Sequence, residues 1–467
     1  MGLGRIQVSK KIAIIGAGAA GLCGAKHMIE AGCDVTLYEI GSHVGGMWVY
    51  NNDNKLSSAY KTLHINTARD LTAFEDFRFD GNVQPFPDHR DMARYLAAYA
   101  SAYDITRRIR FKTRVTDVRP APTYAVERPR WQVVTEHGDT EDYDSVIVAS
   151  GHLSKPEEVP LLRDSFTGEY LHSHYYRDPA VYASKRICVV GVGNSSCDIA
   201  SDVCSTAERT VLVARSTPLI IPKLIFGRPF WEVLKPFYNP WVPAAVRGSA
   251  IKFFTWVVHG RMADLGFAPS TKKVHATSNA NIVNHIRYQR VTVKQGIQAV
   301  HGRTLVFSDG TSEEFDTLIA ATGYALELPF IKPEVVAVKD NGLDLYMRMV
   351  PPEWRGLYFL GFFNSDSALN WIVEGQIRWI REFELGRVAL PTKAAMLTEI
   401  AERKAWLQRT FKASSRHNIE VEHIPYFKDL RRTMKEAQRR TGVPVRDIGI
   451  GTERRLAAPN PQPAAAE

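Results

Sequence analysis

Short runs of apolar, β-branched residues recur along the chain, and the first of them leads directly into a glycine-rich turn. The run "KIAII" (11–15) is followed by "GAGAAG" (16–21), by a stretch with helical spacing of its apolar residues, and by "DVTLYE" (34–39). A short apolar run bounded by turn residues is typical of a buried strand, and Gly32 suits a helix C-terminus. The pattern therefore predicts a strand–turn–helix–strand unit.

The same pattern returns later in the chain, with Gly191 lying 175 residues after Gly16. "RICVV" (186–190) predicts a strand, "GVGNSS" (191–196) a tight turn that opens a helix, and "RTVLVARS" (209–216) the next strand. A spacing this long indicates a repeated domain rather than a solenoid of short repeats.

Two further segments resemble each other, "DYDSVIVASGH" (142–152) and "EFDTLIAATGY" (314–324). Each combines an acidic residue, a buried strand and a Ser/Thr–Gly step where the chain leaves the sheet. The simplest arrangement is an α/β fold with two Rossmann-like dinucleotide-binding domains, the second inserted into the first. The expected bounds are 1–155 and 310–455 for the discontinuous first domain, 156–309 for the inserted domain, 218–259 for an aromatic-rich insertion, and 456–467 for a disordered Pro/Ala tail.

The first turn has the residues of a dinucleotide site. Gly16, Gly18 and Gly21 form a GxGxxG pattern, and Glu39 ends the next strand 23 positions after Gly16. The glycines allow a tight turn and bring a pyrophosphate close to the amides of the helix N-terminus. A carboxylate at Glu39 accepts hydrogen bonds from ribose hydroxyls and repels a 2′-phosphate, which favours FAD or NAD. The alternative is a structural turn without a ligand.

The second turn differs in a way that favours another cofactor. It keeps Gly191 and Gly193 but has Ser196 in place of the third glycine. At the end of the following strand stand Arg215 and Ser216 instead of a carboxylate. A guanidinium and a hydroxyl suit a 2′-phosphate through charge-assisted bonds. The second site is therefore expected to bind NADPH, the alternative being a solvated arginine at a strand end.

Composition and charge narrow the class of protein. The chain has 467 residues, of which 45% are hydrophobic and 23% charged, as in ordinary soluble globular proteins. Five cysteines without a CxxC pair predict reduced thiols and a cytoplasmic location, and they offer no redox pair for a disulfide reductase. The start "MGLGRIQVSK" runs straight into a strand, so we expect no secretory leader, and no apolar stretch predicts a membrane-spanning helix.

The net charge of +9 is concentrated near the C-terminus. Residues 401–455 contain 14 Lys/Arg and 7 Asp/Glu, which predicts a basic C-terminal surface and gives no indication of a nucleic-acid partner. Residues 218–259 are rich in Phe and Trp. We interpret them as a packed insertion that lines the substrate access or a dimer interface, with an interfacial membrane helix as the alternative. No metal site is indicated.

The segment "FTGEYLHSHYY" (166–176) fits FxGxxxHxxxY, a fingerprint of the flavin-containing monooxygenases. Further segments resemble that family in the right order, so that the resemblance spans roughly residues 10 to 430: "VGGMW" (44–48), 60–79, "ATGY" (321–324), "EGQIRWI" (374–380) and "IPYFKDL" (424–430).

The resemblance implies roles for individual residues. Asn66 matches the family's asparagine at the flavin face and is the catalytic candidate. The residues implied to contact FAD are Gly16, Gly18, Gly21, Glu39, Gly46, Met47 and Trp48, with Gln376 near the isoalloxazine ring. Those implied to hold NADPH are Gly191, Gly193, Asn194, Ser195, Arg215 and Ser216.

The implied activity is an FAD- and NADPH-dependent monooxygenation that transfers oxygen from a C4a-hydroperoxyflavin to a nucleophilic nitrogen or sulfur. The expected partners are a small amine or sulfide, O2, a second copy of the chain in a homodimer, and a membrane surface in peripheral contact. Two alternatives remain open. Baeyer–Villiger monooxygenases end the fingerprint in Trp followed by Pro or Asp, whereas this chain has Tyr176 and Arg177. An NADPH-oxidising sensor without a dedicated substrate needs the same two sites.

Overall fold

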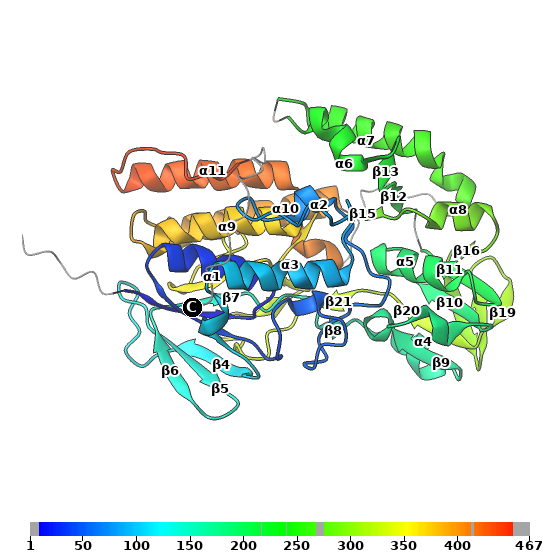
Figure 1. Ribbon diagram of the computed structural model, residues 1–467, viewed down its shortest axis with the longest axis horizontal. Helices are drawn as coiled ribbons and strands as arrows, with labels where there is room; N and C mark the ends of the chain where they lie inside the picture. Colours follow the sequence, from blue (N-terminus) through cyan, green and yellow to red (C-terminus); the bar gives the residue numbers. More distant parts are fainter. Residues whose placement is uncertain (1–8, 216, 240, 268–274, 412–414, 452–467) are drawn as a thin grey trace, which may run out of the picture.

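A computed structural model of the chain describes residues 9–215, 217–239, 241–267, 275–411 and 415–451. Ser216 and the segment 456–467, for which disorder was expected, lie outside the described residues. Figure 1 shows two α/β units side by side, one on the left formed by both ends of the chain and one on the right formed by its middle. This confirms the expected α/β class with two dinucleotide-type sheets.

The first sheet contains five parallel strands in the order β24–β7–β1–β2–β3. Side chains alternate across a strand, so Ile12 and Ile14 pack in one hydrophobic cluster and Ala13 in another. The apolar character of the central strands follows from this burial on both faces. The bounds are β1 Lys11–Ile15, β2 Asp34–Tyr38, β3 Ile109–Arg110, β7 Ser145–Val148 and β24 Leu357–Phe359.

Helices cover one face of this sheet and an antiparallel meander covers the other (Figure 1). The helices are α1 (Ala19–Glu30), α3 (His89–Ala102) and α9 (Leu369–Glu384), and α1 packs directly on α9. The meander consists of β4 (Val115–Pro120), β5 (Trp131–Thr135) and β6 (Thr140–Tyr143). The fully buried Trp131 side chain belongs to the same hydrophobic cluster as Ala13.

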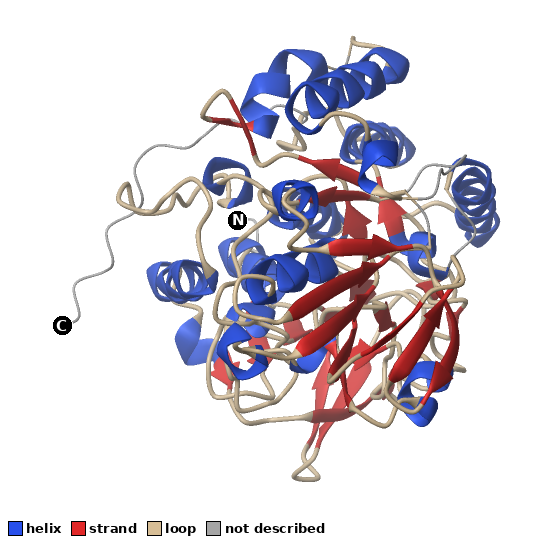
Figure 2. Cartoon of the chain, turned by 90° about the vertical axis from the view of Figure 1, so that its right-hand side faces the viewer, coloured by secondary structure: helices blue, strands red, loops and turns tan. Residues whose placement is uncertain are grey.

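The second sheet repeats this design with five parallel strands in the order β16–β11–β10–β20–β9. Figure 2 views the molecule from the side of this unit and shows the strands fanned, with helices of the insertion above them. The bounds are β9 Glu169–His172, β10 Arg186–Val190, β11 Arg209–Val213, β16 Thr292–Lys294 and β20 Thr317–Ala320, with α5 Asn194–Val203 after β10.

The boundary expected at residue 310 is wrong, because β20 belongs to the second sheet. Ile187 of β10 stands opposite Thr317 of β20, and a second meander of β17 (Ile297–His301), β18 (Thr304–Phe307) and β19 (Ser312–Glu314) precedes β20. The two similar segments at 142–152 and 314–324 therefore occupy the same place in different sheets. The second unit extends through Ala320.

The two connections between the units are short strands that pair with each other. β8 (Lys155–Pro156) pairs antiparallel with β21 (Tyr324–Ala325). The chain thus enters the second unit and leaves it at the same place.

The insertion after β11 forms an arm with a small core of its own. β12 (Leu219–Ile221) pairs in parallel with β15 (Ala276–Ser278) at its base. Between them lie α6 (Phe230–Leu234) and α7 (Ala244–His259), which cluster around buried residues such as Ile225. The segment at 218–259 is therefore a folded arm that leaves many of its aromatic side chains exposed.

The remaining elements connect and cover these units. They are α2 Arg69–Thr72, α4 Pro160–Ser165, α8 Ile282–Arg287, α10 Lys393–Thr410, α11 His423–Arg440, β13 Leu224–Ile225, β14 Arg228–Pro229, β22 Val338–Lys339, β23 Gly342–Leu343, β25 Asn364–Ser365 and β26 Glu420–Val421. None of the helices in the described ranges is both long and apolar enough to cross a bilayer.

The contact between α9 and α11 yields a stability prediction. A Cβ at Gly375 in α9 would lie 2.7 Å from Cε1 of Phe427 in α11, whereas one at Gly248 in α7 would meet nothing within 4 Å. Gly375→Ala should lower the free energy of unfolding, because overpacking costs about 1–3 kcal/mol and helix propensity returns about 1 kcal/mol. The control Gly248→Ala should keep or raise stability. Urea denaturation measures both, and equal stability of the two variants would contradict the prediction.

Candidate active site

The first glycine turn leaves β1 and enters α1 with no room for side chains. Gly16 has φ +103°, and a Cβ there would lie 2.7 Å from the carbonyl oxygen of Ala149 at the end of β7. A Cβ at Gly21 would lie 1.8 Å from the carbonyl oxygen of Gly16. Gly18 is the N-cap of α1 and provides no side-chain cap. The first amides of α1 therefore lack a side-chain partner and suit an anionic group.

A second pair of glycines forms the other wall of this cradle. Gly45 donates its N–H to the carbonyl oxygen of Ala17 at 3.0 Å, and a Cβ at Gly46 would lie 3.1 Å from Cα of Gly18. After this close backbone contact, Met47 is exposed and Trp48 packs partly against the core. The sequence-predicted residues Gly46, Met47 and Trp48 thus lie directly beside the first turn.

Glu39 is buried next to the turn and holds it together. Its Oε2 accepts a hydrogen bond from the Ala17 N–H at 2.9 Å, and its Oε1 accepts one from the Gly41 N–H at 2.8 Å. Oε1 also accepts a longer hydrogen bond from Nδ2 of Asn54 at 3.4 Å, so the second lone pair of Oε2 leaves capacity for a ribose hydroxyl. Sequence reasoning placed Glu39 at this position and missed its bonds to the backbone, because they depend on the loop that follows β2.

The second turn reproduces the geometry of the first. Gly191 has φ +123°, and a Cβ there would lie 2.4 Å from the carbonyl oxygen of Ala321, just after β20. Gly193 is the N-cap of α5, again without a side-chain cap. The buried Ser196 donates its Oγ–H to the carbonyl oxygen of Gly193 at 2.9 Å. Ser196 therefore closes the turn in which a third glycine was expected.

The remaining residues predicted to bind NADPH lie around this turn and differ in exposure and hydrogen bonding. The Oδ1 of Asn194 accepts a hydrogen bond from the Ser278 N–H at 2.9 Å, which directs this side chain toward β15. Ser195 is exposed at the start of α5. Arg215 is exposed just beyond β11 and makes no ion pair or hydrogen bond with the described part of the chain. It remains open to an anionic ligand, whereas Ser216 is not among the described residues.

Asn66 lies in the loop that precedes α2, and its side-chain oxygen, Oδ1, is one of several buried polar atoms that lack a hydrogen-bond partner among the described residues. Leaving a buried amide oxygen unpaired costs about 1–3 kcal/mol, and such groups are rare in folded proteins. Together with the two glycine turns, this orphaned oxygen fits a site built to receive bound cofactors.

Gln376 is placed in the core rather than at an open surface. Its Oε1 accepts a hydrogen bond from the Gly361 N–H at 3.1 Å, and its Nε2 donates to the Tyr426 hydroxyl at 2.8 Å. A Cβ at Gly361 would lie 3.2 Å from that of Ala20 in α1. The Gln376 amide thus holds the backbone that passes the start of α1, and its contact with the isoalloxazine ring stays a prediction.

A polar cluster that the sequence did not reveal joins α5 to the loop carrying Asn66. Asp198 accepts hydrogen bonds from the Tyr60 hydroxyl at 2.8 Å and from Nδ2 of Asn279 at 2.6 Å. Burial raises the pKa of Asp198, an effect opposed by the Lys223 cation, and burial lowers the pKa of Lys223.

A second carboxylate of α5 binds the same loop. Asp202 accepts hydrogen bonds from the hydroxyls of Thr62 and Tyr176, and burial raises its pKa to about 6. The i,i+4 spacing of Asp198 and Asp202 places both on one face of α5. That spacing was the signal in the sequence that could have revealed this contact.

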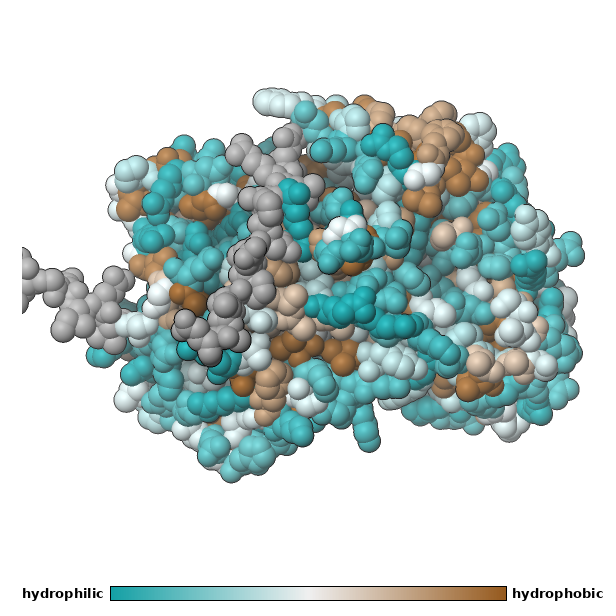
Figure 3. Space-filling view, in the orientation of Figure 1, coloured by the Kyte–Doolittle hydropathy of each residue, from teal (hydrophilic) through white to brown (hydrophobic). Residues whose placement is uncertain are grey.

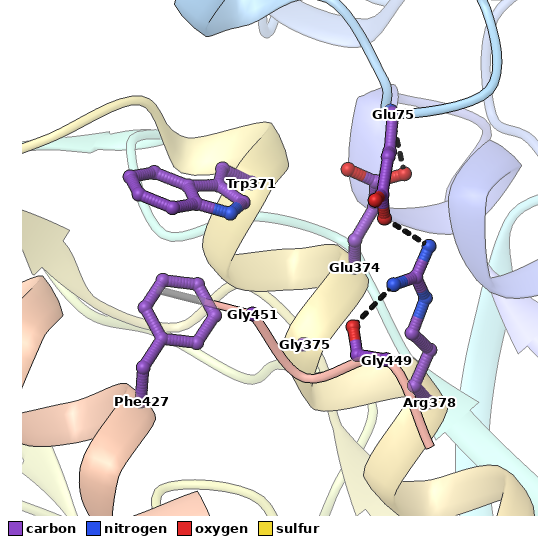
Figure 4. A pocket seen from close by; sticks show the side chains of 8 residues that line it. All are labelled: Glu75, Trp371, Glu374, Gly375, Arg378, Phe427, Gly449 and Gly451. Carbon is purple, nitrogen blue, oxygen red and sulfur yellow. Dashed lines mark hydrogen bonds and ion pairs between the residues drawn. The ribbon is translucent and has the colours of Figure 1, made fainter. Parts of the chain in front are cut away.

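A small recess lies elsewhere, between α9, α11 and the chain near its C-terminus (Figure 4). Figure 4 shows Arg378 bonded to Glu75 and to the carbonyl oxygen of Gly449, opposite the rings of Trp371 and Phe427. With a volume near 10 Å³ it has room for about one water molecule. It contains none of the predicted site residues.

Comparisons with known proteins find similar chains over almost the whole length of this one. The family model described as flavin-binding monooxygenase-like matches residues 9–439. The chain is 28% identical over 444 residues to dimethylaniline monooxygenase (N-oxide-forming) 2 of Oryctolagus cuniculus, covering 91% of this chain and 82% of that protein.

Two solved structures share the fold. S-allyl-L-cysteine S-oxygenase from Allium sativum superposes with a TM-score of 0.69 at 23% identity, covering 94% of this chain and 90% of that chain. The OTEMO complex with FAD and NADP superposes with a TM-score of 0.67 at 18% identity, covering 91% of this chain and 97% of that chain.

The open setting of Arg215 yields a prediction on cofactor choice. Arg215→Ala should weaken NADPH binding by about 1.5–3 kcal/mol, the range for a hydrogen bond to a charged group, and should leave NADH binding unchanged. Titration of the purified protein with both cofactors measures the two dissociation constants. Arg261→Ala, at an exposed arginine paired with Asp264, is the control. An equal loss for both cofactors would show that Arg215 does not read the 2′-phosphate.

Proposed function

The chain belongs to the flavin-binding monooxygenase-like family, and from this premise we propose that it transfers one oxygen atom of O2 to a nucleophilic nitrogen or sulfur of a small organic substrate. As a member of the family it is an oxidoreductase and a flavin-dependent monooxygenase that uses FAD, NADPH and O2. The proposed substrates are amines and sulfides, which agrees with the N-oxide and S-oxygenation activities named for its relatives.

The observation that carries the proposal is the unpartnered Oδ1 of Asn66. Bound FAD supplies the activation of O2, and NADPH supplies the hydride that this activation consumes. A neutral amide can both donate and accept hydrogen bonds without bringing a charge, so Asn66 can stabilise a reactive oxygen group without protonating it.

The other residues of the site bind and shield. The amides after Gly18 and Gly193 hold the two pyrophosphates, and Arg215 holds the 2′-phosphate. Asp198 and Asp202 fix the loop of Asn66 against α5. Such packing excludes water from the reacting atoms and provides polar groups that are already oriented.

The junction after the fingerprint supports heteroatom oxygenation over ketone insertion. Arg177 stands where Baeyer–Villiger enzymes have Pro or Asp, and its guanidinium donates to the carbonyl oxygens of His174, Tyr176 and Ser57. Incubation with a tertiary amine, a thioether and a cyclic ketone separates the alternatives. N-oxide or S-oxide formation supports the proposal, lactone formation supports ketone insertion, and NADPH oxidation indifferent to all three supports the sensor.

Asn66→Ala should separate cofactor turnover from oxygen transfer. We expect NADPH oxidation to continue while the yield of product per NADPH falls about fivefold or more, because one hydrogen-bonding group worth about 1–3 kcal/mol is removed. A peroxide assay beside product analysis measures the diversion. Asn82→Ala, at an exposed asparagine, is the matched control. An unchanged product yield would remove Asn66 from the catalytic set.

The five cysteines are all free and buried, and on this ground we propose a reducing, cytoplasmic location. For partners, the arm carries exposed aromatic residues that are here together called the α7 surface: Phe253 and Trp256 on α7, Trp241 just before it, and Phe226 between β13 and β14. Figure 3 shows hydrophobic residues gathered at the upper right, over α7.

Charge favours a membrane over a second copy as the partner of the α7 surface. Residues 224–261 contain five Lys/Arg and one acidic residue, so a symmetric dimer through this surface would bring like charges together. Basic groups beside exposed aromatic rings suit the headgroup region of an anionic bilayer. The homodimer proposed from the sequence would then use another surface.

Vesicle sedimentation tests the membrane contact. The protein should bind vesicles that contain phosphatidylserine more strongly than vesicles of phosphatidylcholine alone, and Trp241→Ala with Trp256→Ala should reduce binding about tenfold or more, since each buried aromatic ring contributes about 1.5–3 kcal/mol. The control is Tyr288→Ala, at an exposed ring outside the surface. Absence of vesicle binding, together with a dimeric mass in light scattering that falls to the monomer mass in the double tryptophan variant, would assign the surface to self-association instead.

A further inference from the structure

The two consecutive carbonyl groups at Asn66 are both held by side chains of the arm. Nζ of Lys223 donates to the carbonyl oxygen of Ile65 at 3.1 Å, and Oγ of Ser278 donates to that of Asn66 at 3.2 Å. Lys223 follows β12, and Ser278 ends β15, where it stands opposite Ile221. The two donors therefore come from the same end of the small parallel sheet at the base of the arm.

Ser278 also binds the second glycine turn. Its N–H donates to Oδ1 of Asn194 at 2.9 Å, and the neighbouring Thr277 donates its Oγ1–H to the carbonyl oxygen of Val192 at 3.0 Å. β15 is thus bonded on one side to the turn that opens α5 and on the other side to Asn66. A continuous path of two hydrogen bonds links Asn194, Ser278 and Asn66.

The Lys223 side chain points into the protein, where it binds other groups, and not into solvent. Besides the Ile65 carbonyl, its cation faces the Asp198 carboxylate and lies 5.5 Å from the centre of the Phe86 ring. The carboxylate offsets part of the cost of removing the ammonium from water, and burial still lowers the pKa of Lys223. Asp198 in turn holds Tyr60 of the same loop, so the loop is fixed at its start and at Asn66.

We propose that Lys223 and Ser278 are positioning residues for Asn66. Because Ser278 is also bonded to Asn194, cofactor binding at the second turn restrains the backbone at Asn66 through Ser278. The Asn66 side chain has no partner of its own at Oδ1, so its direction is set by the backbone that carries it. Fixing both carbonyls fixes that backbone, as supporting contacts do for precise sites. This inference rests on the proposed function for the roles of Asn66 and of the second turn.

Hydrogen exchange read by mass spectrometry tests the link without relying on turnover. The FAD-loaded protein is compared with and without NADP⁺, following the amides of residues 63–68, where the Ile65 N–H is bonded to the carbonyl oxygen of Pro87. NADP⁺ should slow exchange there in the natural protein. In Ser278→Ala this slowing should shrink about three- to tenfold, the effect of one hydrogen bond, and Ser278→Thr should restore it.

A matched control and a second variant define the outcomes. Ser201→Ala removes a hydroxyl whose one hydrogen bond within the described ranges goes to the carbonyl oxygen of Cys197 in α5, and this variant should behave like the natural protein. Lys223→Met should lose the protection of residues 63–68 as Ser278→Ala does. Both positioning variants should also raise the peroxide formed per NADPH about three- to tenfold, with the rate of flavin reduction unchanged.

Two results would overturn the inference, and they differ from each other. If NADP⁺ protects residues 191–196 in Ser278→Ala and also protects 63–68 as in the natural protein, Ser278 does not connect them, whatever the enzyme oxygenates. If NADP⁺ protects neither segment in the natural protein, the second turn does not bind this cofactor. The failure then lies in the proposed function, and the inference falls with it.

Discussion

A backbone carbonyl sets the dimensions of each glycine turn. In the first unit it belongs to Ala149, and in the second to Ala321, and each occupies the space that a Cβ of the turn's first glycine would need. Both carbonyls lie just after a strand, β7 or β20, that pairs with the strand leading into the turn. The order of the strands therefore decides which carbonyl meets each turn. The same contact occurs in both units and sets the direction of α1 and α5. The uncapped first amides of both helices therefore suit the same kind of ligand. The two proposed pyrophosphate sites follow from these two close approaches.

The site between the turns consists of groups that support one neutral amide. Apart from Arg215, the charged residues around Asn66 are held by the chain itself: Lys223 donates to the Ile65 carbonyl and feels the nearby Asp198 carboxylate, which accepts from Tyr60. These charged residues hold the loop that carries Asn66 against the second unit. The reactive chemistry belongs to cofactors, and the chain contributes shape, dryness and fixed dipoles.

Local patterns were sufficient to predict the two strand–turn–helix–strand units and the place of Glu39, because each unit is a short continuous stretch, 11–39 or 186–216, that follows strand and helix periodicity. Local patterns failed to predict contacts between segments that are far apart in the sequence. The strand at 317–320 was correctly seen as a counterpart of 145–148, but only pairing with β10 shows which sheet it joins. The contacts Tyr60–Asp198 and Lys223–Ile65 span 138 and 158 residues, and no periodicity encodes them. The motif at 374–380 likewise did not predict that the Gln376 side chain is buried beside Tyr426.

The antiparallel pairing of β8 with β21 has a topological consequence. The second unit begins and ends at adjacent strands, which neighbouring ladders place only about 5 Å apart, so in terms of connectivity it is a single long loop of the first unit. Removing everything between Lys155 and Ala325 would leave two chain ends that already touch. Such a joint is what gene-level insertion of one folded module into another requires. The second unit is therefore joined to the first as an inserted module whose two connections lie at one joint.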